Sequence, residues 1–127
     1  MLDPKKNVLV VDDMSSVREI VMRSIRGMGF EHIIEAADGN EAFEALQTAV
    51  IPVGLIISDW NMPVCSGLEF LKRVRTHPTT KTIPFMMLTS ESEKDQIIGA
   101  IKAGVNGYIL KPFTPDDLVQ RIKAMKV

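Results

Sequence analysis

The stretch LIISDWNMPVCSG at positions 55–67 places a carboxylate, Asp59, directly after a short apolar run, with Pro63 and Gly67 close behind. A short apolar run that is bounded by turn residues is typical of a strand buried in a sheet. A carboxylate at the end of such a strand needs a reason, because charged groups are rarely buried without a partner. The stretch therefore predicts a buried strand over 55–58 whose carboxyl end presents Asp59.

Strand and helix patterns alternate along the rest of the chain. Short β-branched or apolar runs predict four further strands, at 7–12, 32–36, 83–88 and 107–110. Apolar residues at helical spacing predict helices at 15–29, 38–47, 67–76 and 92–104, and a last one that starts at Thr114. Five such units in strict alternation predict an α/β fold, a doubly wound and mostly parallel five-stranded sheet with helices on both faces.

The helix patterns also predict inward faces and helix ends. Ser16 and Glu19 have the spacing of a capping box at the start of the first helix. Thr114 followed by Pro115, Asp116 and Asp117 is a strong start for the last helix. The residues predicted to face inward are Val17, Ile20, Val21, Ile25 and Met28 in the first helix, and Ile97 and Ile101 in the fourth.

Length and composition limit the kind of molecule. The chain has 127 residues, so residues 1–127 are expected to form a single domain without a separate output domain. The 15 Lys and Arg residues nearly balance the 16 Asp and Glu residues, so no net field draws the chain to nucleic acid. The single cysteine, Cys65, excludes an internal disulfide, and no apolar run is long enough for a membrane span. We therefore expect a cytoplasmic protein without nucleic-acid partners or membrane insertion.

Polar residues follow four of the predicted strands: Asp12 and Asp13, Asp59, Thr89 and Ser90, and Lys111. The carboxyl ends of parallel strands share one edge, and a ligand site lies there where the strand order reverses. Each residue alone has an ordinary explanation, such as a helix cap for Asp13 or a solvated loop position for Lys111. Three crowded carboxylates, however, raise one another's pKa or require a cation.

A hard divalent cation fits this set of residues. Mg²⁺ takes oxygen ligands and is commonly held by one or two carboxylates together with phosphate oxygens, which suits Asp12, Asp13 and Asp59. Zinc does not fit, because the chain has one cysteine, and His32 and His77 are far from these segments. A carboxylate beside Mg²⁺ and a lysine has the groups that phosphoryl transfer requires.

Several motifs carry a family resemblance: VVDD at 10–13, SDWNMP at 58–63, LTSE at 88–91, AGVNGYILKPF at 103–113, and Arg18 shortly after the acids. In order and spacing they resemble the receiver domain of two-component response regulators, in particular the stand-alone CheY-like chemotaxis branch. The resemblance covers essentially the whole chain. It implies a flavodoxin-like sheet with strand order 2-1-3-4-5.

The resemblance also implies roles for individual residues. Asp59 would be the phosphorylated aspartate, with Lys111 paired to the phosphoryl group through a segment that has a cis bond to Pro112. Mg²⁺ would be held by Asp13 directly, by Asp12 largely through water, by Asp59 and by the backbone carbonyl of Asn61. Thr89 would be the switching hydroxyl and Tyr108 the switching aromatic. Asn61 and Glu91 occupy the positions that influence the lifetime of the phosphoryl group in the family. Ile98 and Lys102 are expected either to contact a partner or to be ordinary surface, and Tyr108 either to belong to the partner surface or to be an ordinary half-buried strand tyrosine.

These roles imply a phosphoacceptor that catalyses only its own phosphorylation and dephosphorylation. Upstream we expect a histidine kinase of the CheA type, and downstream either a flagellar motor switch protein or a histidine phosphotransfer protein; the chain is expected to be monomeric. A phosphorelay intermediate and a phosphate sink remain alternatives. An aspartate-based phosphohydrolase is disfavoured because WNM after Asp59 lacks a second acid, and a flavin carrier because DDMSS opens with two anions. Ser66 departs from the acid that many receivers have before the loop glycine.

Overall fold

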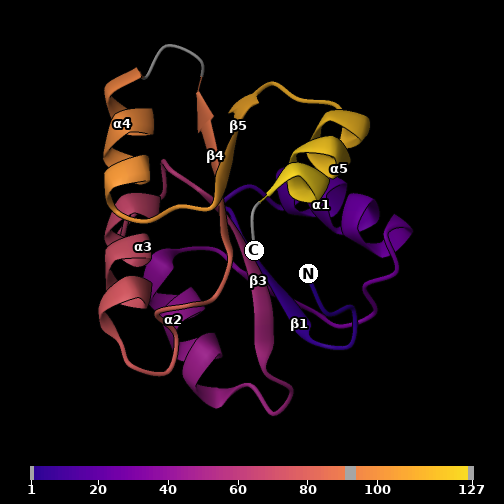
Figure 1. Cartoon of the computed structure of the whole chain (residues 1–127), viewed down its shortest axis with the longest axis horizontal. Helices are drawn as coiled ribbons and strands as arrows, with labels where there is room; N and C mark the ends of the chain where they lie inside the picture. Colours follow the sequence, from indigo (N-terminus) through magenta and orange to yellow (C-terminus); the bar gives the residue numbers. More distant parts are fainter. Residues whose placement is uncertain (1, 91–93, 126–127) are drawn as a thin grey trace.

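The computed structural model describes residues 2–90 and 94–125, which form five strands that alternate with five helices (Figure 1). The strands are β1 (Asn7–Val11), β2 (Ile33–Ala36), β3 (Val53–Asp59), β4 (Phe85–Ser90) and β5 (Gly107–Lys111). The helices are α1 (Ser15–Gly27), α2 (Gly39–Thr48), α3 (Gly67–Thr76), α4 (Lys94–Lys102) and α5 (Pro115–Ala124). The predicted alternation is confirmed.

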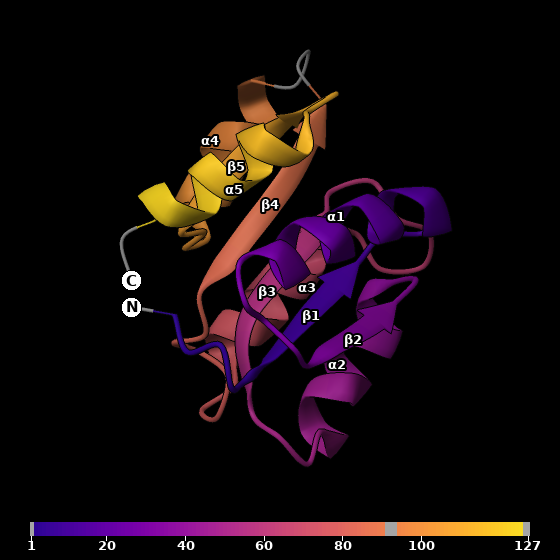
Figure 2. The ribbon, with the colours of Figure 1, turned by 90° about the vertical axis from the view of Figure 1, so that its right-hand side faces the viewer.

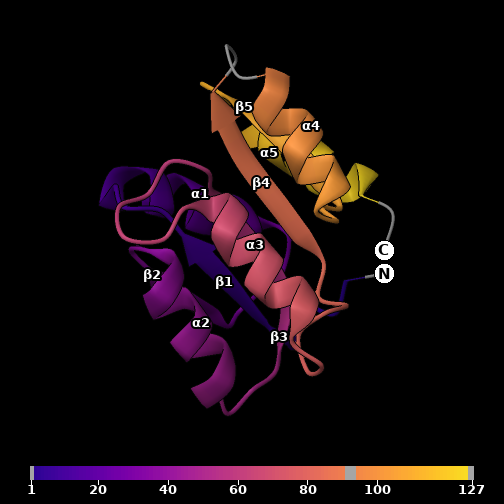
Figure 3. The same cartoon turned by 90° about the vertical axis from the view of Figure 1, so that its left-hand side faces the viewer.

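The strands form one sheet in the order β2-β1-β3-β4-β5, and all neighbours are parallel. Helices α1 and α5 cover one face, and α2, α3 and α4 cover the other (Figures 2 and 3). The register aligns the strand ends, because Val11 lies opposite Ser58 and Ser90 lies opposite Lys111. The predicted doubly wound fold with order 2-1-3-4-5 is therefore confirmed, and the carboxyl ends of the central strands meet at one edge.

The apolar core has two halves, one on each face of the sheet. Every residue of β1 is buried, since helices cover both faces of this central strand. Val8 and Val10 belong to the half under α1 and α5, whereas Leu9 and Val11 belong to the half under α2, α3 and α4. This alternation follows from the two-residue period of a strand.

Two of the predicted inward residues point to solvent instead. Ile20 of α1 is 42% exposed and Ile101 of α4 is 57% exposed. Helix α1 buries Val21 and Ile25 against the sheet and α5, and Ile20 falls at the edge of that face. Helix α4 meets the core through the fully buried Ala100, so its apolar stripe is narrower than the sequence pattern predicts.

The helix starts confirm one prediction and correct another. Thr114 caps α5 in a capping box with Asp117, with Pro115 in the first turn. The capping box predicted from Ser16 and Glu19 is wrong: the N-cap residue of α1 is Met14, two residues before Ser16, and it makes no side-chain cap hydrogen bond. The backbone N–H of Met14 is instead bound by the side chain of Asp12, whose Oδ1 accepts a hydrogen bond from it at 2.9 Å.

The last two strands end later in the chain than the sequence pattern predicts. Strand β4 begins at Phe85 rather than at Ile83 and runs through Ser90, and β5 includes Lys111. The late start has a local reason, because Pro84 has no N–H to donate, while its carbonyl accepts a hydrogen bond from Ile56 at 2.9 Å. Thr89 and Lys111 therefore lie within strands, which fixes their side chains more firmly than loops would. Among the described helices none is long and apolar enough to cross a membrane.

Gly67 allows α3 to start directly against the end of β3. Its N–H donates to the Trp60 carbonyl at 2.8 Å, and a Cβ here would collide with the Asp59 carbonyl oxygen and lie 2.9 Å from Trp60 Cα. We expect Gly67→Ala to lower the free energy of unfolding by about 3 kcal/mol, because the end of β3 and the start of α3 must move apart to make room for the methyl group. Gly27→Ala is the matched control, since nothing lies within 4 Å of its Cβ position. Urea unfolding of both variants tests this, and equal stabilities would contradict it.

Candidate functional site

The predicted polar edge of the sheet holds a cluster of charged side chains. Asp12 follows β1, Asp59 ends β3 and Lys111 ends β5. Asp13 lies beside Asp12, and Thr89 comes one residue before the end of β4. Strand β1 lies between β2 and β3, so this edge is where the strand order reverses. The sheet therefore brings together residues that the sequence separates by up to 99 positions.

Three carboxylates form the acidic part of this cluster. Oxygen atoms of Asp12, Asp13 and Asp59 all lie within 4.8 Å of one another. Asp12 and Asp59 are buried, whereas Asp13 is exposed. This arrangement confirms that the three predicted acids converge on one point.

Lys111 is the cation that the described residues supply to these carboxylates. Its Nζ lies 3.1 Å from Asp12 Oδ2 and 3.1 Å from Asp59 Oδ1. Asp59 Oδ1 also accepts a hydrogen bond from the Trp60 backbone N–H at 2.9 Å, whereas no described residue donates to its Oδ2. One ammonium group in contact with two of the three carboxylates leaves an excess of negative charge in the cluster.

Burial and neighbouring charge shift the pKa values of both central groups. Burial raises the pKa of Asp59 above its ordinary value of 3.8, and the charge of Asp12 raises it further, while Lys111 and the Trp60 N–H oppose this rise. For Lys111, burial alone would lower the pKa, but the charges of Asp59 and Asp12 outweigh burial and raise it. Lys111 therefore keeps its charge, whereas the ionised form of Asp59 is disfavoured by its surroundings.

The donor set suits a hard divalent cation. The cluster offers only carboxylate oxygens, which are the ligands that Mg²⁺ and similar ions prefer. A cation here would also offset the excess negative charge that Lys111 leaves. The residues present therefore fit the metal site predicted from the sequence.

Thr89 brings a buried hydroxyl group to the same edge of the sheet. Its side chain is fully buried, and its Oγ1 has no hydrogen-bond partner among the described residues. A buried hydroxyl without a partner costs about 1–3 kcal/mol, so such a group calls for an explanation. An acceptor that arrives at the acidic cluster would supply one.

Arg18 has a structural part in the site that the sequence reasoning did not recognise. Its Nη1 donates to the Asp12 backbone carbonyl at 2.6 Å, and its Nε lies 3.0 Å from Glu35 Oε1 on β2. Arg18 therefore ties the end of β1 to β2 and to α1. Its place one helical turn into the helix that follows the two acids was a usable clue.

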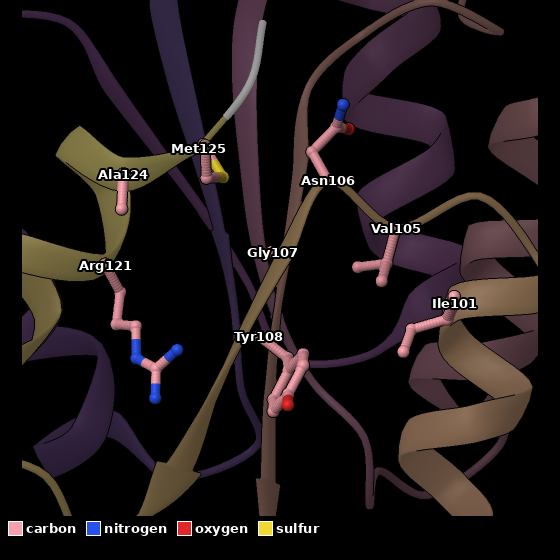
Figure 4. Close-up of a pocket in the computed structure, with 8 residues that line it drawn as sticks. All are labelled: Ile101, Val105, Asn106, Gly107, Tyr108, Arg121, Ala124 and Met125. Carbon is pink, nitrogen blue, oxygen red and sulfur yellow. The ribbon is translucent and has the colours of Figure 1, made fainter.

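The other predicted site residues lie away from the acids or remain untested. Tyr108 on β5 is half-buried beside a cavity of about 260 Å³, and its ring lies on the side of the strand toward Ile101 of α4 (Figure 4). Ile98 and Lys102 are exposed on α4. The family-specific role of the Asn61 carbonyl stays a prediction, and Glu91 lies outside the described residues.

Two further details bear on the expectations from the sequence. The Lys111–Pro112 bond is cis, as expected. Ser66, the departure from the acidic residue of many receivers, caps α3: its Oγ accepts a hydrogen bond from the Glu69 N–H at 3.2 Å. The serine thus has a local structural role that an acid can also fill.

Residues 8–123 match the family described as the response regulator receiver domain. The chain belongs to that family. It is 43% identical over 118 residues to the chemotaxis protein CheY1 of Helicobacter pylori, with 93% of this chain and 94% of that protein covered. As a receiver domain it is a phosphoacceptor signalling protein.

Solved structures of other response regulators are similar to this receiver domain. The chemotaxis response regulator CheY4 of Vibrio cholerae has a TM-score of 0.83 and 37% identity, covering 93% of this chain and 96% of that one. The Mn(2+)-bound form of response regulator Rcp1 has a TM-score of 0.78 and 28% identity, covering 91% of this chain and 87% of that one. The receiver fold thus extends over the described strands and helices alike.

The raised pKa of Asp59 predicts how stability depends on pH in the absence of metal. An acid whose pKa is higher in the folded state stabilises the fold fully below its ordinary pKa of 3.8 and loses that contribution as pH rises through the folded value. In a chelating buffer we therefore expect the unfolding free energy of the wild type, relative to that of Asp59→Asn, to fall as pH rises across this window. Urea unfolding at a series of pH values tests this. A difference that does not change with pH would contradict the raised pKa.

Proposed function

We propose that Asp59 accepts a phosphoryl group from a histidine kinase in a Mg²⁺-dependent reaction, and that the phosphorylated chain signals by binding another protein in chemotaxis. The observation that carries this proposal is the buried Asp59 carboxylate, which lies beside two further acids and is held by Lys111. The chemotaxis proteins among the relatives support the biological setting. A histidine kinase of the CheA type and a flagellar motor switch protein are the partners we propose.

The reaction uses Asp59 as a nucleophile. Because Trp60 N–H and Lys111 both engage Oδ1, Oδ2 is the oxygen that the described residues leave free to form the new O–P bond. As that bond forms, the bond between phosphorus and the donor's imidazole nitrogen breaks, and the electron pair leaves with the imidazole. The product on Asp59 is an acyl phosphate, and its later hydrolysis returns the carboxylate and inorganic phosphate.

Mg²⁺ would be held by Asp12, Asp13, Asp59 and the Asn61 carbonyl, and when bound it would neutralise phosphoryl oxygens during transfer. The Mn(2+)-bound relative Rcp1 supports a divalent metal here. Lys111, which already lies 3.1 Å from Asp59, offers its ammonium group to a phosphoryl oxygen. These residues orient and neutralise the transferring group, which is most of what phosphoryl transfer requires.

The signal begins at Thr89. Its hydroxyl, which has no partner among the described residues, gains an acceptor when a phosphoryl oxygen arrives on Asp59. Movement of Thr89 toward the phosphoryl group opens space into which Tyr108 turns. Both residues lie on neighbouring strands of the sheet, with Thr89 opposite Leu110 and Tyr108 opposite Met87. The change is a shift in population between two packings.

The partner surface in this proposal is formed by α4, β5 and α5. Ile98 is 51% exposed and Ile101 is 57% exposed, so α4 offers apolar area to a partner. Arg121 of α5 lies over the Tyr108 ring, with Cζ 5.8 Å from the ring centroid, on the opposite side of the cavity from Ile101 (Figure 4). A turn of Tyr108 would therefore change both walls of this cavity.

Phosphorylation can be followed at Trp60, the only tryptophan of the chain. Trp60 is mostly buried and directly follows Asp59, so its fluorescence should respond to Mg²⁺ and then respond further to acetyl phosphate. Asp59→Asn should lose the response to acetyl phosphate. A silent titration, together with an unchanged protein mass, would show that Asp59 is not a phosphoacceptor.

The proposed switch can be followed at Tyr108, the only tyrosine. In protein labelled with 3-fluorotyrosine, acetyl phosphate should shift the ¹⁹F resonance of the wild type. Thr89→Ala should still be phosphorylated, as judged by mass, but should lose more than half of that shift, because the hydroxyl that couples the two sites is absent. A full shift in phosphorylated Thr89→Ala would disprove the coupling.

A further inference from the structure

A half-buried arginine joins two loops at the other end of the molecule from the acidic cluster. Arg75 lies in the last turn of α3. Its guanidinium donates to four oxygens: Nε to Gly104 O at 2.9 Å, Nη1 to Ile83 O at 2.7 Å and to Lys81 O at 3.2 Å, and Nη2 to Asn106 Oδ1 at 2.8 Å. These acceptors belong to the α3–β4 loop and to the α4–β5 loop, and all of them are neutral.

The end of α4 presents one of these acceptors. Val105 N–H donates to Ala100 O at 3.0 Å and Gly104 N–H donates to Ile101 O at 3.1 Å, which is the Schellman pattern of a helix end. Gly104 takes the left-handed conformation that this pattern needs, with φ of +96°. A Cβ on Gly104 would lie only 3.2 Å from Arg75 Nε, so the glycine also makes room for the guanidinium.

Asn106 connects Arg75 to the sheet. Its backbone N–H donates to Phe85 O at 2.9 Å, and its side-chain Oδ1 accepts from Phe85 N–H at 2.8 Å as well as from Arg75. Asn106 thus pairs with the first residue of β4 and places the start of β5. Tyr108 follows two residues later, so Arg75 and Tyr108 are linked through a short length of paired strand.

The same loop forms a wall of the cavity beside Tyr108. Val105, Asn106 and Gly107 line this cavity together with Ile101 and Tyr108 (Figure 4). Val105 and Tyr108 also pack against the same half of the core. Displacement of the loop would therefore change the space that is available to the Tyr108 ring.

We propose that Arg75 is a positioning residue of the signalling surface: it holds the α4–β5 loop where Tyr108 can take up its two packings, and it does so without contact with the acidic cluster. This inference rests on the proposed function in one respect, namely that the surface of α4, β5 and α5 is the one a partner reads. The last turn of α3 would then contribute to signalling, although it lies neither in the acidic cluster nor on the surface of α4, β5 and α5.

Arginine is suited to this place by its geometry. The guanidinium group holds several N–H donors in a rigid planar fork, whereas lysine has its donors on a single nitrogen. A lysine at 75 would keep the charge and most of the side-chain stem but could not reach oxygens on both loops at once. Burial lowers the pKa of Arg75, in keeping with a guanidinium group that is partly removed from water.

The experiment compares Arg75→Lys with Arg73→Lys in protein labelled with 3-fluorotyrosine. Arg73 is a matched control on the same helix, because its guanidinium lies over the Phe43 ring at 4.4 Å and donates to Asn40 at 2.6 Å, away from the α4–β5 loop. In Arg75→Lys we expect a displaced Tyr108 resonance before phosphorylation and less than half of the wild-type shift on addition of acetyl phosphate. The Mg²⁺ titration of Trp60 should keep its midpoint within about twofold, a difference of about 0.4 kcal/mol. Arg73→Lys should match the wild type in both measurements.

The outcomes separate this inference from the proposed function. A Tyr108 resonance in Arg75→Lys that equals the wild type with and without acetyl phosphate would overturn the inference, even if the variant unfolds at a lower temperature. If the wild-type resonance does not shift on phosphorylation, the proposed switch fails, but the comparison of wild type and Arg75→Lys before phosphorylation still decides whether Arg75 positions Tyr108.

If Arg75→Lys does not fold, Asn106→Ala takes its place, because it removes one acceptor of Arg75 and leaves the arginine itself. A displaced Tyr108 resonance is expected there too, and an unchanged one would count against the inference.

Discussion

The site depends on one ammonium group shared between two buried carboxylates. Lys111 Nζ lies 3.1 Å from both Asp12 and Asp59, although the three residues come from the ends of three different strands. Two buried acids would repel each other, and a buried lysine would lose its charge more easily, so each group depends on the others. The ammonium does not offset all of the negative charge, because Asp13 joins the same cluster. That imbalance suits the cluster to a divalent cation, whose charge would in turn offset that of a phosphoryl group.

The strand order explains how these groups meet and how a signal can leave them. Lys111 on β5 reaches across the end of β4 to Asp59 on β3 and to Asp12 after β1. Thr89 lies on the strand that Lys111 crosses, so Asp59 and Tyr108 are separated by a single strand of the sheet. In the proposed switch, a change at Asp59 would therefore pass sideways through strand pairing and packing rather than along the chain.

Much of this architecture could be predicted from the sequence, and the failures have physical reasons. The apolar runs of the central strands and the acids after them determine the sheet and the site, since buried parallel strands allow few other arrangements. Ile20 and Ile101 match a helical stripe but lie at the edge of a contact whose width depends on neighbouring elements. Ser16 has the right spacing for a cap, yet α1 begins at Ser15, so Ser16 lies inside the first turn rather than before it. The bonds of Arg75 could not be predicted, because its acceptors are mostly backbone carbonyls, which leave no trace in the sequence.

Uneven packing of the helices determines which surface can move. Helices α1 and α3 bury several large side chains, whereas the described residues of α4 include a single fully buried one, Ala100. A helix with so little buried area is displaced at lower cost than its neighbours. At the C-terminal end of α4 the hold is hydrogen bonding, through the carbonyl of Gly104 and Arg75. In the proposed switch, a helix that packs loosely along its length but is fixed at its C-terminal end could shift its other end toward or away from the acidic edge, so that a small movement of Thr89 would change the outer face of α4 and β5.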